Sequence, residues 1–374
     1  MKKAHLLAAT LALAAASGAQ AQAQGTGSVT IYGLLDAAVE HLSNTGPTGG
    51  GLTRFPDLAG ALAPSRLGFR GVEDLGGGLS AIFTLEEGIA VDSGNINQGG
   101  RAFGRQAFVG LKGGWGELTA GRVYTMLGGS LADVDVLGPG QTGLGSLDPY
   151  LPNARSDNAL SYRGTFGGFS LGATYSLGRD VSSAGGPGAT NCPGESLTDK
   201  GACKQWSALL RYDASNWGAA FGYDRYHGGT GAAAAFGPAN SSLTDTRMNI
   251  GAYAKLGALK IGGGVLTRNN QGVTTPTATT NPKSAITYIA ASYAITPAIA
   301  LEGQLARYDL KDSGNDTNQA VARAVYTFSK RTAVYGQVGH VSNKGTAARS
   351  IASGGTVVPG GGQTGLQAGI RTTF

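Results

Sequence analysis

Beyond its first residues the chain has no long apolar run, and it is poor in charge, cysteine and histidine. Charged residues make up 14% of the sequence, against roughly 25% in an average soluble domain. No later stretch approaches the roughly 20 apolar residues that a membrane-spanning helix needs. Strands can cross hydrocarbon only as a closed barrel, because every backbone amide there needs a partner. A membrane protein of this composition would therefore be a barrel.

Further absences argue against two classes of function. No dense block of lysine and arginine with interleaved aromatic residues occurs, so no nucleic-acid partner is expected. No Walker loop or metal-ligand spacing occurs, and the abundant glycine has no period of three residues. The histidines outside the N-terminal segment, His41, His227 and His340, lie at expected strand ends with no serine or acidic motif beside them. We therefore expect no catalytic site, metal site or cofactor, although an outer-membrane lipid hydrolase remains the enzymatic alternative.

The N-terminal segment has the pattern of an export signal. Lys2 and Lys3 precede an apolar run from Leu6 to Ala16, and two A-x-A sites allow cleavage after Ala21 or Ala23. The alternative, an uncleaved anchor, is disfavoured because about a dozen apolar residues are too few to span a bilayer. We assign residues 1–23 to the signal peptide and 24–374 to one barrel domain. The formal net charge of +6 falls to +4 when both lysines leave.

The two cysteines of the chain, Cys192 and Cys203, are predicted to form a disulfide. They flank a short polar insert rich in turn-forming residues. Because exported proteins pass through an oxidising compartment, we predict a disulfide that closes this loop. A metal site would need further ligands nearby, and no other cysteine or histidine lies near them.

The C-terminal stretch alternates apolar and polar residues at period two up to Phe374. A strand with lipid on one face and water on the other must have this pattern. The pattern recurs about sixteen times, at residues 27–41, 64–71, 79–90, 102–112, 116–124, 158–165, 168–178, 205–213, 217–227, 245–256, 258–269, 284–295, 298–310, 318–328, 331–342 and 363–374. These ranges predict an all-β, 16-stranded antiparallel transmembrane barrel.

The connections between these segments alternate between short and long. Tight turns are expected at residues 72–78, 113–114, 167, 213–216, 257, 296–297 and 329–330, and the other connections are long and polar. Outer-membrane barrels have short turns at the periplasmic end and long loops at the outer end. About sixteen strands enclose a water-filled lumen, whereas about eight enclose only side chains. The count therefore favours a channel.

The expected faces can be assigned in several segments. Phe169, Leu171, Ala173, Tyr175 and Leu177 should face lipid, as should Trp206, Ala208, Leu210 and Tyr212. Aromatic residues recur near segment ends, where amphipathic rings suit the membrane interface: Tyr162, Tyr175, Tyr212, Tyr223, Tyr326 and Phe374. Phe374 is also expected to be the C-terminal signal for the outer-membrane assembly machinery, because bacterial outer-membrane strands characteristically end in an aromatic residue.

Several segments together resemble the general diffusion porins of Gram-negative bacteria, particularly the beta-proteobacterial and neisserial branch. They are SVTIYGLLDAAVE at 28–40, SRLGFRGVEDLGGGLSAIFTLEEGI at 65–89, FGRQAFVGLKGGWGELTAGR at 104–122, YTFSKRTAVYGQVGHVSN at 326–343 and the terminal IRTTF. The resemblance spans the mature chain. It implies a homotrimer of sixteen-stranded barrels in the outer membrane, each with a pore narrowed by its third outward loop.

The third long connection, about residues 124–157, is acidic. It carries Asp133, Asp135, Asp148 and Asp157 and has no lysine before Arg155. Composition alone leaves open whether this loop is solvated outside the barrel or folded into it. The resemblance favours a loop folded into the lumen, with Asp133 and Asp135 at the constriction.

The wall opposite this loop is expected to be basic. Arg66 and Arg70 alternate with Leu67 and Phe69 and so should point into the lumen, as should Arg155 and Arg163 by the same parity. Alternation is ambiguous for Arg105, which we place inward by resemblance to the family's FGRQA motif, and Arg122 has the same difficulty.

Arginines facing carboxylates across a narrow aqueous gap predict a channel for small polar solutes and ions with weak anion preference. The arginines could equally serve to hold the loop by ion pairs. The alternatives are a structural or adhesive surface barrel closed by its loops and a substrate-specific channel. Expected partners are a homotrimer, outer-membrane lipid and lipopolysaccharide, the assembly machinery, and small solutes and ions.

Overall fold

The computed structural model describes residues 27–56, 62–138, 140–178, 192, 194–229, 238, 240–274 and 279–374. The expected signal peptide, residues 1–23, lies outside these residues. No helix in the described part is both long and apolar enough to span a membrane.

Most of the described chain is strand, and every strand pairing is antiparallel. The barrel wall consists of β1 (Ser28–Thr45), β3 (Arg66–Gly76), β4 (Leu79–Gly88), β5 (Gln106–Gly113), β6 (Gly116–Tyr124), β7 (Arg155–Phe166), β8 (Phe169–Ser176), β9 (Gln205–Asp213), β10 (Trp217–His227), β11 (Thr244–Leu256), β12 (Leu259–Asn270), β15 (Lys283–Thr296), β16 (Ile299–Leu310), β17 (Thr317–Thr327), β18 (Thr332–Asn343) and β19 (Gly362–Thr373). The connections hold β2 (Gly50–Arg54), β13 (Val273–Thr274), β14 (Thr279–Thr280), α2 (Asn97–Gly100), α3 (Met126–Leu131), α4 (Leu144–Leu147) and the 3₁₀ helix η1 (Leu151–Asn153).

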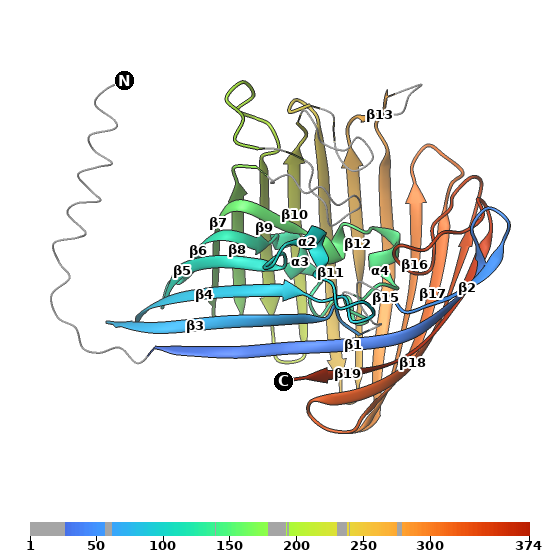
Figure 1. The fold of residues 1–374 in the computed structure, drawn as a ribbon, viewed down its shortest axis with the longest axis horizontal. Coiled ribbons are helices and arrows are strands. Elements are labelled where there is room, and N and C mark those ends of the chain that lie inside the picture. The colour runs from blue at the N-terminus through green and yellow to red at the C-terminus, as the bar shows by residue number, and fades with distance from the viewer. Residues whose placement is uncertain are drawn as a thin grey trace.

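The sheet closes because its first strand pairs with its last. β1 pairs with β3 over Ser28–Leu34 and with β19 from Leu34 opposite Thr373 to Leu42 opposite Gly365. Beyond β19, the amide of Gly33 donates to the carbonyl of Phe374 at 3.1 Å. In Figure 1 the blue strands β1, β3 and β4 cross the front of the view and the yellow to orange strands stand behind them. The predicted sixteen-stranded antiparallel barrel is confirmed.

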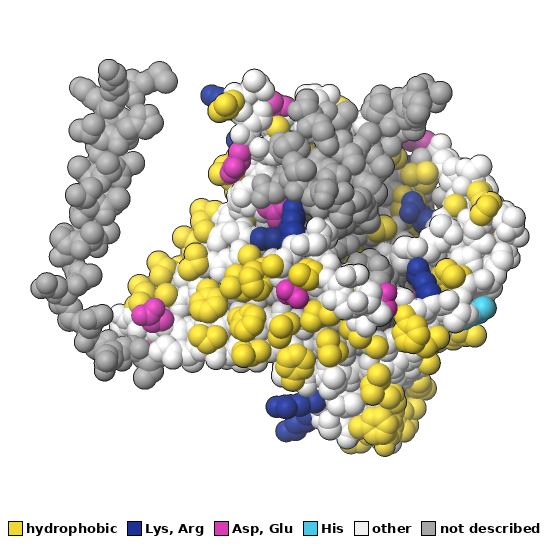
Figure 2. Space-filling view, viewed as in Figure 1, with side chains coloured by type: hydrophobic (Ala, Val, Ile, Leu, Met, Phe, Trp, Pro, Cys, Tyr) yellow, Lys and Arg dark blue, Asp and Glu magenta, His cyan; other side chains and the backbone are white. Residues whose placement is uncertain are grey.

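The two faces of the wall follow the predicted alternation. In β8, Phe169, Leu171 and Tyr175 are exposed on the outside, while Thr174 and Ser176 are buried. In β9, Trp206 and Leu210 are exposed, whereas Ser207 is buried. Figure 2 shows apolar side chains spread over the wall that faces the viewer. An apolar exterior of this kind suits contact with lipid.

Aromatic rings collect on the outer face near the strand ends. At the short-turn end, the ring centroids of Phe169 and Tyr212 are 4.7 Å apart and those of Tyr326 and Phe328 are 4.8 Å apart. Nearer the long-loop end, the rings of Trp206 and Tyr223 are 4.5 Å apart. Such rings suit the two membrane interfaces.

Short turns and long connections segregate to opposite ends of the barrel, as expected. The predicted turn at 72–78 is too long, because β3 continues to Gly76 and the reversal occupies only two glycines. Gly76, Gly77 and Gly78 all have positive φ, which glycine tolerates without steric cost. The strand β2, which pairs with the end of β1, and the short helices were not predicted.

Candidate functional site

The connection between β6 and β7, residues 125–154 and called here the inner loop, lies inside the barrel. Its first helix, α3, contacts β8 to β11. The amide of Met126 donates to the Ser207 hydroxyl at 3.0 Å. On the far side, the Gln337 amide of β18 donates to the Thr142 hydroxyl at 2.7 Å. The inner loop therefore crosses the lumen from β9 to β18.

Arginines from the wall hold the inner loop in place. Arg247 of β11 makes a buried ion pair with Asp148, with a Nε to Oδ2 distance of 2.7 Å. Arg323 of β17 donates to the carbonyl of Leu137 at 2.9 Å. Arg349, in the connection before β19, donates to the carbonyl of Leu147 at 3.1 Å. Apolar contacts add to this attachment, since inner-loop leucines pack against inward tyrosines of the wall.

A cavity of about 410 Å³ remains between the inner loop and the wall. The wall contributes three arginines, and the loop contributes two carboxylates. The charged lining residues are Arg66 at the start of β3, Arg105 before β5, Arg163 in β7, and Asp133 and Asp135 of the inner loop. The cavity therefore has cationic groups on its wall side and carboxylates on its loop side.

Arg105 and Arg66 share one carboxylate, Glu86 of β4. The distance from Arg105 Nε to Glu86 Oε1 is 2.8 Å, and that from Arg66 Nε to Glu86 Oε2 is 3.7 Å. Tyr32 also donates its hydroxyl to Glu86, at 2.9 Å. Glu86 therefore orients both arginines and cancels one of their two charges.

Tyr124 supports two arginines at the end of β6. Its hydroxyl accepts hydrogen bonds from Arg105 Nη2 at 2.5 Å and from Arg155 Nη2 at 2.8 Å. Arg155 is buried, and its Nε donates to the carbonyl of Arg105 at 2.9 Å. Among the described residues no carboxylate lies within ion-pair distance of Arg155. Arg155 thus adds positive charge behind the cavity without lining it.

The other predicted arginines take different positions. Arg70 is exposed and stacks at 5.3 Å over the ring of Tyr32, on the lumen face but outside the cavity lining. Arg163 lines the cavity and donates to the carbonyl of Tyr124 at 3.2 Å. Arg122 does not line the cavity. Its side chain is 10% exposed, pairs with Asp157 and donates to the carbonyl of Gly104 at 2.7 Å.

The two cavity carboxylates differ in their surroundings. Asp133 accepts hydrogen bonds from Lys260 at 2.7 Å and from Arg211 at 2.6 Å, and these contacts lower its pKa to about 2. Asp135 is partly buried and accepts a hydrogen bond from Gln304 at 2.8 Å, and its removal from water raises its pKa to about 7. One carboxylate is thus charged but paired with cations, and the other is partly protonated at neutral pH.

Asp148 is an anchor rather than a pore group. Its burial favours the neutral carboxyl, but the charges of Arg247 and Arg268 outweigh that effect and lower its pKa to about 2. The carboxylate therefore stays ionised and paired to the wall.

Sequence reasoning missed the partners of the charged residues. Glu86 could have been found, because it lies two residues from Thr84 on the inward face of β4. Arg211 and Lys260 lie far along the chain from Asp133, and no sequence pattern links them to it.

The histidines and cysteines lie away from the cavity. His41 and His340 contact threonine hydroxyls through Nδ1, and His227 contacts the carbonyl of Ser241. Cys192 and Cys203 are joined by a disulfide with Cα atoms 5.6 Å apart, in the long connection after β8. The described residues contain no cluster of potential metal ligands.

Comparison with known proteins gives consistent matches over nearly the whole chain. The family model described as Gram-negative porin matches residues 8–346. Outer membrane porin protein 32 of Delftia acidovorans is 30% identical over 394 residues, covering 100% of both chains. The solved structure of an anion-selective porin from Comamonas acidovorans has a TM-score of 0.75 at 26% identity, covering 93% of this chain and 100% of that one. The trimer form of OmpT from Vibrio cholerae shares the fold, with a TM-score of 0.61 at 15% identity, covering 93% of this chain and 100% of that one.

Proposed function

The chain belongs to the Gram-negative porin family and is an outer-membrane channel for general diffusion, and we propose that its constriction prefers anions. The constriction is the cavity between the inner loop and the wall. The observation that carries the proposal is the lining of this cavity, in which three arginines face two carboxylates. One carboxylate, Asp133, is paired with cations, and the other, Asp135, is partly protonated at neutral pH.

The balance of charge at the cavity is positive. Three arginines at or near the cavity have no carboxylate within ion-pair distance among the described residues: Arg70, Arg155 and Arg163. Two more, Arg66 and Arg105, share Glu86, which cancels only one of their two charges. Across the gap, Asp133 is offset by Arg211 and Lys260, which bind it from the barrel wall.

A narrow aqueous gap with low-dielectric walls concentrates such a field. Charged rings of this kind determine selectivity in pores. The related structure from Comamonas acidovorans is described as anion-selective, which supports the same preference here.

The test is a reversal potential in a planar bilayer under a salt gradient. Replacing Arg66 and Arg70 together by serine should shift the reversal potential toward cation preference. The matched control replaces Lys330 and Arg331, two cations at a short turn between β17 and β18, and should leave it unchanged. An unaltered reversal potential in the first variant would refute the assignment of these arginines to selectivity.

Conductance also distinguishes the channel from a barrel closed by its loops. Stepwise openings in groups of three would support both an open pore and a homotrimer. The outer face of β1 and β3 suits a subunit contact, because Gly33 and Gly71 let the rings of Phe374 and Phe83 lie close over the sheet. Absence of openings in correctly folded protein would favour the closed barrel.

A further inference from the structure

Four glycines on the lumen face of the wall lie directly against the inner loop and are called here the glycine seat: Gly172 of β8, Gly222 of β10, Gly251 of β11 and Gly262 of β12. All four are buried. None of them has a positive φ, so their backbone conformation is open to any residue. What these four positions share is the close approach of the inner loop.

The inner loop leaves no room for a side chain at two of these glycines. A Cβ atom at Gly262 would overlap the carbonyl oxygen of Val134 and lie 3.2 Å from that of Asp133. A Cβ atom at Gly222 would overlap the Ser130 hydroxyl and lie 2.6 Å from Ser130 Cβ. Nonbonded carbon atoms attract best at roughly 3.5–4.0 Å. A methyl group at either position would therefore push the loop away from the wall.

The other two glycines meet side chains of the loop. A Cβ atom at Gly172 would overlap the sulfur of Met126, and one at Gly251 would overlap the side chain of Val134. Because an unbranched thioether side chain can change rotamer, Gly172 should tolerate a methyl group best. The contact thus changes from a flexible side chain at β8 to loop backbone at β12.

The strand register places part of the seat in one row. Gly172 and Gly222 lie opposite Leu209 of β9 from its two sides, and Gly222 also lies opposite Asn249 of β11. This row crosses β8 to β11, the strands that α3 contacts. The seat therefore follows the path of α3 over the wall.

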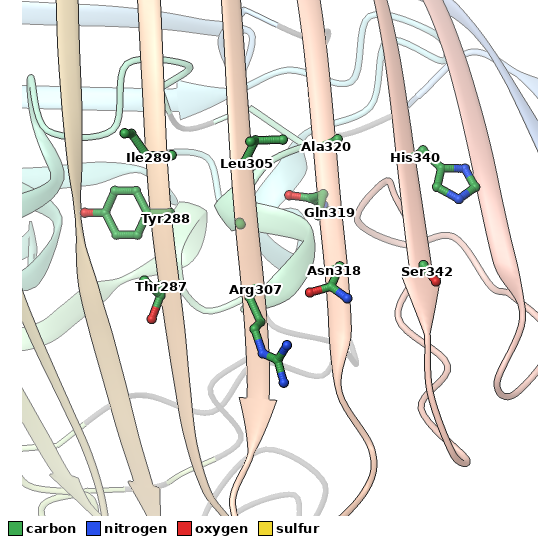
Figure 3. A pocket seen from close by; sticks show the side chains of 11 residues that line it. Thr287, Tyr288, Ile289, Leu305, Arg307, Asn318, Gln319, Ala320, His340 and Ser342 are labelled. Atoms are coloured by element: carbon green, nitrogen blue, oxygen red, sulfur yellow. The ribbon is translucent and has the colours of Figure 1, made fainter.

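Asn249 ties the loop to this row. Its Nδ2 donates to the Ser130 hydroxyl at 3.1 Å, and its Oδ1 accepts a hydrogen bond from the Tyr288 hydroxyl of β15 at 3.2 Å. Figure 3 shows the ring of Tyr288 extending from β15 away from Leu305 of β16, toward the side on which β12 pairs. Polar contacts beside the glycines thus hold the loop at one depth.

The seat also places Asp133. The close approach at Gly262 brings Asp133 within reach of Lys260, which lies two residues earlier in β12, and Arg211 binds it from β9. Arg211 Nη1 donates to the carbonyl of Ala132 at 2.9 Å as well. Asp133 has a φ of 65°, in the left-handed region that residues other than glycine seldom adopt. Its pairing with two cations therefore depends on the depth of the loop.

The cavity of the constriction lies on the other side of the inner loop from the seat. The helix α3 contacts β8 to β11, and its residues Gly128, Gly129 and Leu131 line the cavity. The arginines across the cavity, by contrast, come from β3, β7 and the segment before β5. A loop lifted off the seat would therefore move into the cavity and toward these arginines.

We propose that the glycine seat determines the specificity of the channel, because the depth of the inner loop sets both the width of the cavity and the pairing of Asp133. A side chain at the seat narrows the cavity and separates Asp133 from Lys260 and Arg211. An unpaired carboxylate in a narrow aqueous gap favours cations, so conductance and anion preference fall together. The selectivity part of this inference rests on the proposed anion preference, whereas the conductance part does not.

The test is the single-channel conductance and reversal potential of the folded protein in planar bilayers. Gly262→Ala should lower the conductance and shift the reversal potential toward cation preference, and Gly172→Ala should change both values less. The matched control is Gly336→Ala on the outer face of β18, where a Cβ atom would meet nothing within 4 Å. It makes the same chemical change and should give native values.

A rescue experiment separates positioning from general destabilisation. Gly222→Ala should also lower conductance and anion preference. Ser130→Gly removes the side-chain atoms that the new methyl group would strike, so the double variant should recover most of the conductance of the Ser130→Gly protein. Ser130→Gly also removes a hydrogen bond from Asn249, so a protein that was merely destabilised would become worse. If Gly262→Ala does not assemble, this pair of variants carries the test, because the clash at Gly222 is with a side chain.

Three results would overturn the proposal. They are native conductance in folded Gly262→Ala, larger conductance in that variant, which would mean that the loop is released instead of lifted, and no recovery in the double variant. A native protein without anion preference would contradict the proposed function instead, and the fall in conductance would still test the seat.

Discussion

The arginines of this barrel differ mainly in the partners that surround them. Arg247 has two buried carboxylates and acts as an anchor, whereas Arg163 faces the cavity without an ion pair among the described residues. Arg105 shares one carboxylate with Arg66. Charge that is already paired contributes little to the field in the pore, so the unpaired arginines should dominate selectivity.

We predict that Asp135 makes the proposed anion preference depend on pH. Its pKa of about 7 means that the carboxyl is mostly neutral at pH 6 and mostly ionised at pH 8. Ionisation adds negative charge to the cavity, so anion preference should fall as pH rises through this range. Reversal potentials at the two pH values should show the change, and Asp135→Asn should abolish it.

Asp133 is the matched control for this prediction. Its pKa of about 2 keeps it ionised throughout the same range. Asp133→Asn should raise anion preference equally at pH 6 and pH 8 and leave the pH dependence intact. If the pH dependence survived in Asp135→Asn and vanished in Asp133→Asn, the roles of the two carboxylates would have to be exchanged.

Tyr124→Phe should destabilise the arginine cluster. It removes the hydroxyl that accepts hydrogen bonds from Arg105 and Arg155, and lost hydrogen bonds to charged groups cost roughly 1.5–3 kcal/mol each. We expect the midpoint of denaturant unfolding to fall. Tyr162→Phe is the control, because the Tyr162 hydroxyl donates to the exposed carbonyl of Trp115. An equal fall in the unfolding midpoint of this variant would contradict a special role for Tyr124.

For single residues, the alternation of apolar and polar positions predicted the direction of some arginine side chains and could not be applied to others. Arg66 and Arg163 lie within strands, where alternation applies, and both line the cavity. Alternation could not apply to Arg105, because β5 begins at Gln106. It was not reliable for Arg155, because a register shift between β6 and β7 interrupts the pattern, with Asn158 at a positive φ of 46°.

The strand is the element that the sequence predicted best. Segments 205–213 and 217–227 match β9 and β10 at both ends, because an apolar exterior and a polar lumen impose strict alternation. The short helices of the inner loop escaped prediction. Their three to six residues are too few to form helix alone, so the surrounding wall determines their conformation.

Loss of the anchor at Arg247 should release the inner loop. Arg247→Ala leaves Asp148 and Asp245 buried with reduced compensation, and breaking a buried ion pair costs roughly 3–5 kcal/mol. Single-channel recordings should then show larger and noisier conductance. The control Arg307→Ala removes an exposed ion pair on the outer face and should leave the recordings unchanged. Native-like conductance and noise in Arg247→Ala would show that other contacts suffice to hold the inner loop.

At the scale of the whole molecule, barrel closure depends on one seam between β1 and β19. The chain's last residue takes part in it, because Phe374 exchanges backbone hydrogen bonds with Gly33. The sequence predicted both strands, but the offset by which β1 pairs first with β3 and then with β19 depends on the tilt of all strands together. Local patterns do not contain that information.

Phe374→Ala should reduce assembly in cells more than it reduces the stability of the folded barrel. The expected role of the terminal ring is recognition by the assembly machinery, while its backbone bonds do not need the ring. We expect less folded protein in the outer membrane, measured by heat-modifiable mobility, and normal conductance of the protein refolded in detergent. Phe328→Ala is the control, because Phe328 is a comparably exposed outer ring, at 63% against 53% for Phe374.

The seam also places the first described strand beside the chain's end. Ser28 to Tyr32 of β1 precede Gly33, which pairs with Phe374, so a short peptide linker could join the start of β1 to residue 374. Cutting the chain instead at an exposed long connection would give a circular permutant. Such a molecule would keep every wall pairing while carrying its free ends on the cell surface, where a reporter peptide or an enzyme could be displayed.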